Sequence, residues 1–166
     1  MKKIAYPILS FILLIFINGC AGYEPIFGST NLQFEIADYS IEDNKILGNK
    51  IYSKLNSLSK SKRDDQNLRS VNLVIKVSKD KNATAKDSAG KILQYKITLN
   101  TDVEVTDFIT RDKILNQIFV SSLTYGVQNK YSDTVNLENQ TIENLLNKTY
   151  QELVIQLAQN IRLKWS

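Results

Sequence analysis

The sequence predicts a single α+β domain in which a mixed four-stranded sheet carries two helices packed on one face, in the order β-α-β-β-β-α. Four segments alternate apolar and polar residues, which is the period of a half-buried strand, although the fourth alternates less regularly. Two further segments repeat apolar residues every three or four positions, which is the period of an amphipathic helix. The sequence shows no internal repeat and no second set of such segments, so one domain is expected.

The first strand is predicted over residues 31–38, where three apolar residues alternate with polar neighbours. Ser40 is followed three positions later by Asp43, which matches a capping box and makes Ser40 the expected N-cap of a helix. This helix is predicted over residues 41–58. Its apolar stripe consists of Leu47, Ile51, Leu55 and Leu58.

The second and third strands are predicted over residues 71–77 and 93–105. Residues 79–90 between them are polar and have no apolar period, so they are predicted to form a solvated loop. The third strand has the clearest pattern in the chain. One of its faces carries Leu93, Tyr95, Ile97, Leu99, Thr101, Val103 and Val105, and the other carries Gln94, Lys96, Thr98, Asn100, Asp102, Glu104 and Thr106.

The fourth strand is predicted over residues 114–125, and a polar connection over residues 126–136 leads to a last helix over residues 137–162. A crossover through a helix makes the first two strands parallel, whereas short connections favour antiparallel pairing of the last three. Both helices then cover one face of the sheet. The other face, with the polar side chains of the third strand, is expected to be uncovered.

The N-terminus has the layout of an export signal that ends at a lipidation site. Two lysines precede an almost unbroken apolar run, which ends in Ile17-Asn18-Gly19-Cys20. Cys20 is the only cysteine of the chain, and it stands where a bacterial lipobox places the cysteine whose thiol is acylated. An ordinary export signal with an incidental cysteine, or an uncleaved anchor helix, is the alternative. The predicted parts are a lipoprotein signal peptide over residues 1–19, a lipidated tether over residues 20–30 and the domain over residues 31–166.

Composition argues against several classes of function. The formal charge is +4, and it falls to +2 once Lys2 and Lys3 leave with the signal, which is a weak footprint for a nucleic-acid-binding protein. The chain has no histidine, so the usual general base and the commonest metal ligand are missing. Asp102 and Glu104 share a strand face, but a solvated strand explains them equally well. We therefore expect neither an enzyme nor a bound cofactor or metal.

Two short stretches carry a resemblance to a known family. After Cys20 and Ala21 the chain reads Gly22-Tyr23-Glu24-Pro25-Ile26-Phe27-Gly28. The second stretch is the third strand and its approach, Asp87-Ser88-Ala89-Gly90-Lys91-Ile92-Leu93-Gln94-Tyr95-Lys96-Ile97-Thr98-Leu99. With the β-α-β-β-β-α order, these stretches resemble the LptE family of lipopolysaccharide-assembly lipoproteins. That family often shows Cys, Gly, an aromatic residue, a variable residue, Pro and a large apolar residue after its signal. This chain matches the pattern with one insertion, Ala21.

The resemblance implies a location, a partner and a ligand. LptE proteins are held on the periplasmic face of the Gram-negative outer membrane by acyl chains such as palmitate. They sit as a plug inside the LptD β-barrel, support its assembly and assist delivery of lipopolysaccharide to the cell surface. Basic side chains of the family contact the anionic lipopolysaccharide. The candidates here lie on or beside the two central strands, where an ordinary surface charge is the other interpretation: Lys91, Lys96, Arg111 and Lys113.

A generic periplasmic lipoprotein that binds another envelope protein complex is the alternative function. Identification of the protein partner would distinguish the two hypotheses. A large outer-membrane barrel as the partner favours the LptE interpretation, and an inner-membrane complex favours the alternative.

Overall fold

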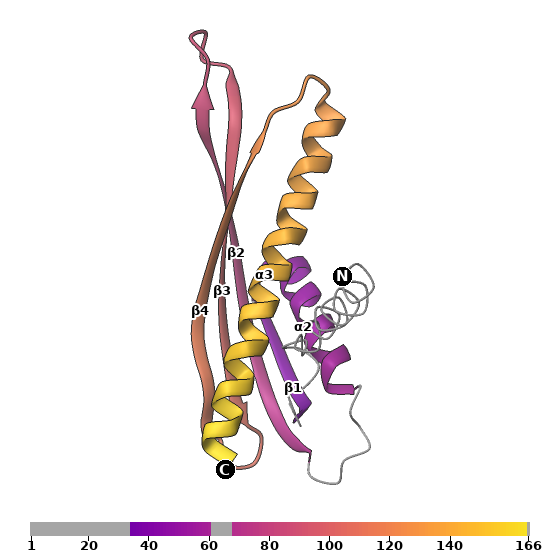
Figure 1. Ribbon diagram of the computed structural model, residues 1–166. Coiled ribbons are helices and arrows are strands. Elements are labelled where there is room, and N and C mark those ends of the chain that lie inside the picture. The colour runs from indigo at the N-terminus through magenta and orange to yellow at the C-terminus, as the bar shows by residue number, and fades with distance from the viewer. Residues whose placement is uncertain (1–33, 61–67, 166) are drawn as a thin grey trace, which may run out of the picture. The chain divides into compact units, whose positions relative to one another are not determined.

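The computed structural model describes residues 34–60 and 68–165, which form one four-stranded sheet and two helices (Figure 1). The predicted α+β class and the order of elements are confirmed. The predicted signal peptide, the tether and Cys20 lie outside the described residues. The elements are β1 (Phe34–Asp43), α2 (Lys45–Lys60), β2 (Arg69–Lys86), β3 (Ile92–Asp107), β4 (Lys113–Gly126) and α3 (Tyr131–Trp165).

The sheet has the predicted mixed topology. Its strands lie side by side in the order β1-β2-β3-β4, with β1 parallel to β2 and the other two pairs antiparallel. β3 has 16 residues, which corresponds to about 53 Å at ~3.3 Å per residue. α3 has 35 residues, which corresponds to about 52 Å at ~1.5 Å per residue. A single helix therefore runs along most of the sheet (Figure 1).

The hydrophobic core lies between the two helices and one face of the sheet. The predicted inward register of β3 is confirmed, because its alternate residues from Ile97 to Val105 are at most 2% exposed. Thr101 belongs to this buried series, and its hydroxyl has no hydrogen-bond partner among the described residues. The helices contribute fully buried side chains at helical spacing: Ile51 and Leu55 from α2, and Leu145, Leu146, Leu153 and Leu157 from α3.

The boundary between β1 and α2 differs from the prediction. Ser40 and Asp43 lie within β1, where Ser40 pairs with Val74 of β2, so the predicted capping box does not form. Asn44 caps α2 instead, since its Oδ1 accepts a hydrogen bond from the Leu47 N–H at 3.1 Å. The helix then packs closely on the strand, because a Cβ at Gly48 would collide with Cγ2 of Ile41.

The predicted loop over residues 79–90 is mostly strand, which is the largest error of the sequence prediction. β2 continues to Lys86 and pairs with β3 down to Ile92, with register shifts near Ala85. The hairpin then closes in a short turn, where Asp87 Oδ1 accepts the N–H groups of Ala89 and Lys91, both at 2.9 Å. Figure 1 shows this β2–β3 hairpin extending past the rest of the sheet.

The last helix begins earlier than predicted, at Tyr131, so the connection after β4 is short. Two features support this start. Thr134 Oγ1 accepts a hydrogen bond from the Gln128 N–H at 2.9 Å, and Asp133 places a negative charge in the first turn, where the helix dipole favours it. Neither α2 nor α3 contains a stretch long and apolar enough to cross a membrane.

Candidate functional site

The four basic residues predicted from the sequence do not form one cluster. Lys91 lies at the tip of the β2–β3 hairpin, and Lys96 lies on the uncovered face of β3. Arg111 and Lys113 lie at the other end of the sheet, in and just after the turn between β3 and β4. Lys113 also forms an ion pair with Glu104 at 3.7 Å. Any ligand that touches all four residues must extend along nearly the whole of β3.

The uncovered face of the sheet presents a row of compensated charges. The strand register aligns Glu42, Lys76 and Asp102 across β1, β2 and β3. Lys76 Nζ lies 2.8 Å from Glu42 Oε2, and the hydrogen bond to Glu42 raises the pKa of Lys76. Nearby, Asn100 Nδ2 donates to Asp80 Oδ2 at 3.4 Å. The face is therefore rich in hydrogen-bonding groups without a strong charge of either sign.

Two apolar side chains interrupt this polar face at its β4 edge. Ile118 and Val120 are each 62% exposed, and they pair with Asp102 and Asn100 of β3. Phe119 between them points to the opposite face and is buried. The sequence prediction did not single out this patch. The sequence signal for this patch is the unbroken apolar run Ile118-Phe119-Val120. A strand that is apolar on both of its faces is typical of a sheet that is covered on both sides.

The β2–β3 hairpin has an open edge. β1 ends at Asp43, which pairs with Val77, so the outer edge of β2 from Ser78 to Lys86 has no neighbouring strand among the described residues. Lysines at three positions of this edge, Lys79, Lys81 and Lys86, are the kind of side chain that protects an exposed strand from unwanted pairing.

The base of this hairpin is fastened to β4 and α3 by one charged cluster. Lys81 Nζ lies 2.5 Å from Glu138 Oε2, and Lys79 Nζ lies 3.7 Å from Glu138 Oε1. The Tyr125 hydroxyl donates to Glu138 Oε2 at 2.9 Å. Lys81 Nζ also lies 4.4 Å from the ring centroid of Tyr95, within the range of a cation–π interaction. One carboxylate of α3 thus binds groups from two other elements, β2 and β4.

Burial and hydrogen bonding oppose each other within this cluster. Burial alone would lower the pKa of Lys81, but its hydrogen bonds to Glu138 and Tyr125 outweigh that effect and raise it. Burial alone would raise the pKa of Glu138, but the hydrogen bonds from Lys81 and Tyr125 lower it. Both groups are therefore charged over the whole physiological pH range, and the cluster acts as a structural clamp.

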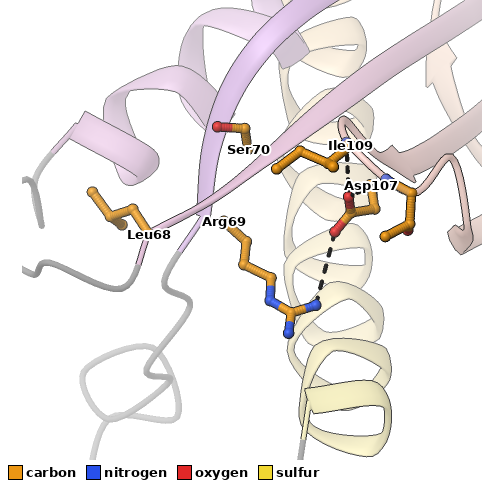
Figure 2. A pocket seen from close by; sticks show the side chains of 6 residues that line it. Leu68, Arg69, Ser70, Asp107 and Ile109 are labelled. Atoms are coloured by element: carbon orange, nitrogen blue, oxygen red, sulfur yellow. Dashed lines mark hydrogen bonds and ion pairs between the residues drawn. The ribbon is translucent and has the colours of Figure 1, made fainter.

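A pocket of about 270 Å³ lies at the opposite end of the sheet, where β2 begins and β3 ends (Figure 2). Asp107 Oδ1 accepts the N–H groups of Ile109 and Thr110, both at 2.9 Å, and Arg69 Nη1 lies 3.8 Å from Asp107 Oδ2. The hydrogen bond from Thr110 is the main cause that lowers the pKa of Asp107, with support from Ile109 and Arg69. The pocket is lined by Leu68, Arg69, Ser70, Asp107, Ile109 and Thr110.

These surfaces carry ion pairs, hydrogen-bonding groups and exposed apolar side chains. Within residues 34–60 and 68–165 the structure brings together no group of three Asp, Glu, His or Cys side chains that could hold a metal ion. The uncovered face, its apolar patch and the hairpin edge are surfaces of the kind that contact another macromolecule.

The sequence and the fold were compared with those of known proteins. No protein-family model and no curated protein matches the sequence. The fold, however, resembles that of rare lipoprotein B from Shewanella oneidensis, with a TM-score of 0.53, 11% identity, and coverage of 76% of this chain and 98% of that one. It also resembles a minor lipoprotein from Acinetobacter baumannii, with a TM-score of 0.52, 11% identity, and coverage of 78% and 92%.

Lipoprotein B from Nitrosomonas europaea shares the fold as well, with a TM-score of 0.53, 9% identity, and coverage of 81% of this chain and 87% of that one. At identities this low, the structural similarity shows a common fold alone. These three proteins are bacterial lipoproteins. The sheet and helices of this chain therefore have an α+β fold that is also found in bacterial lipoproteins.

Proposed function

We propose that this chain is an outer-membrane lipoprotein that plugs and supports assembly of the LptD β-barrel and assists delivery of lipopolysaccharide to the cell surface. Cys20 is the proposed site of lipid attachment, which places the domain on the periplasmic face of the membrane. The lipoproteins that share the fold support the first part of this proposal, and the resemblance to LptE supports the second.

The observation that carries the proposal is the long sheet face that neither α2 nor α3 covers. A barrel lumen is polar, so a protein that fills it needs hydrogen-bonding groups on the surface that meets the wall. The row from Glu42 to Asp102 and the amide of Asn100 provide such groups. Ile118 and Val120 add an apolar centre, which a solvated face would not need but an interface commonly has.

The proposed lipopolysaccharide contacts fall at two levels of the plug. Lys91 and Lys96 belong to the hairpin end, and Arg111 and Lys113 belong to the end where the chain from Cys20 enters the domain. A lipopolysaccharide molecule passing along the domain would meet first one pair and then the other. Phosphate groups are the expected counterparts of both pairs.

Lipidation gives the first prediction. Mass spectrometry of the mature protein from its host membrane is expected to show an N-terminal Cys20 that carries acyl chains. Cys20→Ala should accumulate as an unlipidated precursor, because the thiol is the attachment atom. An unmodified N-terminus at another residue would exclude the lipoprotein assignment.

The barrel gives the second prediction. Val120→Glu is expected to fold normally, since this side chain is 62% exposed. In the complex it would bury an uncompensated charge beside Asn100 and Asp102, at a cost of about 3 kcal/mol or more, which corresponds to about a hundredfold loss of affinity. The measurement is recovery of an outer-membrane barrel with the tagged protein from detergent-solubilised envelopes, after thermal unfolding has shown that the variant is native.

Ile46→Glu is the matched control, because Ile46 is 73% exposed on α2, away from the uncovered face. It should recover as much barrel as the unmutated chain. Asn100→Leu and Lys96→Glu should fold and lower the barrel yield and the resistance of cells to detergent. If the unmutated chain recovers an inner-membrane complex and no barrel, the generic periplasmic lipoprotein replaces this proposal.

A further inference from the structure

The turn between β3 and β4 exposes two large apolar side chains at the extreme end of the sheet. Ile109 is 83% exposed and Phe108 is 41% exposed. Arg111 lies beside them, with its guanidinium carbon 5.4 Å from the ring centroid of Phe108. An apolar pair with an adjacent guanidinium suits the boundary between lipid headgroups and acyl chains, where the apolar part inserts and the cation stays at the headgroups.

This presentation is built into the turn. The Asp107 carboxylate binds the Ile109 and Thr110 N–H groups, and the Asp107 N–H donates to the Asp112 carbonyl at 2.9 Å. The Phe108 N–H donates to the Ser70 carbonyl at 2.9 Å, which ties the turn to β2. Arg111 adopts a φ of 64°, a left-handed conformation that non-glycine residues rarely take. The backbone therefore holds Ile109 outward by several hydrogen bonds.

The chain that comes from Cys20 enters the domain at this same end. Phe34 begins β1 opposite Arg69, and Val71, two residues further along β2, pairs with Asp107 at the start of the turn. Fourteen positions separate Cys20 from Phe34, and at ~3.6 Å or less per residue they span at most about 50 Å. Figure 1 shows that α3 ends near this turn as well, whereas the β2–β3 hairpin points the opposite way.

We infer that the Phe108–Ile109 turn docks into the headgroup layer of the membrane that holds the lipid anchor. The acyl chains supply the affinity for the membrane. The turn supplies a second contact, which fixes the orientation of the domain relative to the membrane. Before any barrel is engaged, the sheet then stands away from the membrane, with the β2–β3 hairpin at its distal end. Two observations favour a lipid bilayer as the surface that this turn contacts. The turn is a protruding tip, which can insert into a deformable bilayer. The anchor also keeps this end of the domain within the length of the tether from the membrane. The inference rests on the anchor of the proposed function and is independent of the barrel.

Site-specific fluorescence tests the inference on the lipidated protein. Acylation occupies Cys20, the only cysteine of the chain, so Ile109→Cys introduces a unique thiol for an environment-sensitive nitrobenzoxadiazole label. The label is read in vesicles of phosphatidylethanolamine and phosphatidylglycerol. We expect its emission to shift to shorter wavelength on reconstitution and its quenching by aqueous iodide to fall. Phe108→Cys, labelled in the same way, is the second variant, should the first fail to fold.

Two control positions give the opposite expectation. Ala89→Cys lies in the hairpin turn at the far end, and Val120→Cys lies on the uncovered face. Both labels should keep water-like emission and full iodide quenching. Retention of the protein on vesicles with a water-like label at residue 109 would overturn the docking of the turn and leave the anchor intact. Loss of iodide quenching at residue 89 or 120 would overturn the upright orientation, and a protein that vesicles do not retain would overturn the anchor itself.

Discussion

Ile97→Ala is expected to lower the free energy of unfolding by about 2–4 kcal/mol, through lost burial and the cavity that remains. Ile97 is completely buried in the core between β3 and the helices. Because the strands on both sides hold β3 in place, the core has little freedom to close around the smaller side chain. Urea unfolding of the mature protein measures this loss as a lower midpoint at an unchanged slope.

Thr98→Ala is the control for this prediction. Thr98 is the next residue of the same strand and lies on the uncovered face, between Asp80 and Ser122. Its truncation should change the stability of the isolated protein by no more than about 0.5 kcal/mol. Equal losses for the two variants would contradict the register of β3.

Glu138→Gln is expected to cost about 2 kcal/mol, because it removes the charge that two lysines and a tyrosine share at the base of the hairpin. The substitution keeps the volume of the side chain, so the loss reports the charge and the acceptor oxygen that the amide lacks, and not a change of packing. Glu143→Gln is the matched control on the same helix. Glu143 pairs with Lys50, but both side chains are about half exposed, at 45% and 46%, so its loss should be below about 1 kcal/mol.

The stability difference between the wild type and Glu138→Gln should depend on pH at both extremes. The pKa of Glu138 is lowered from its ordinary value of 4.5, so its contribution is present above that value and is lost as the pH falls through the folded pKa. The pKa of Lys81 is raised from its ordinary value of 10.5, so its contribution is present below that value and is lost as the pH rises beyond it. Chemical denaturation across pH should therefore give a plateau between these limits, and a difference that is constant at acidic pH would contradict the ion pair.

The sequence predicted the parts of the fold that a hydrophobic core dictates. Apolar and polar residues alternate over residues 97–105 because one face of β3 packs against the helices. This alternation can be recognised in the sequence without the structure. The stripe Leu47, Ile51 and Leu55 likewise placed α2 correctly in its middle. Its start was wrong because Ser40 and Asp43 satisfy a local capping pattern, whereas pairing of β1 with β2 keeps both residues extended.

The outer half of the β2–β3 hairpin could not be predicted in this way. Residues 78–84 are exposed on both faces, so no apolar period distinguishes them from a loop. Their strand conformation comes from hydrogen bonds to a partner strand rather than from burial. The charged cluster was hidden for a related reason: Lys81, Tyr125 and Glu138 are far apart in sequence and meet only in the folded chain.

The parallel pairing of β1 with β2 has a mechanical consequence for a domain that is tethered through its N-terminus. If the domain is anchored as proposed, a pulling force transmitted from the membrane is applied at Phe34 and acts along the axis of β1. The hydrogen bonds between β1 and β2 run across that axis, from Phe34 opposite Arg69 to Asp43 opposite Val77. They are loaded together in shear rather than opened one after another, so an edge strand of ten residues serves as a strong attachment between domain and anchor.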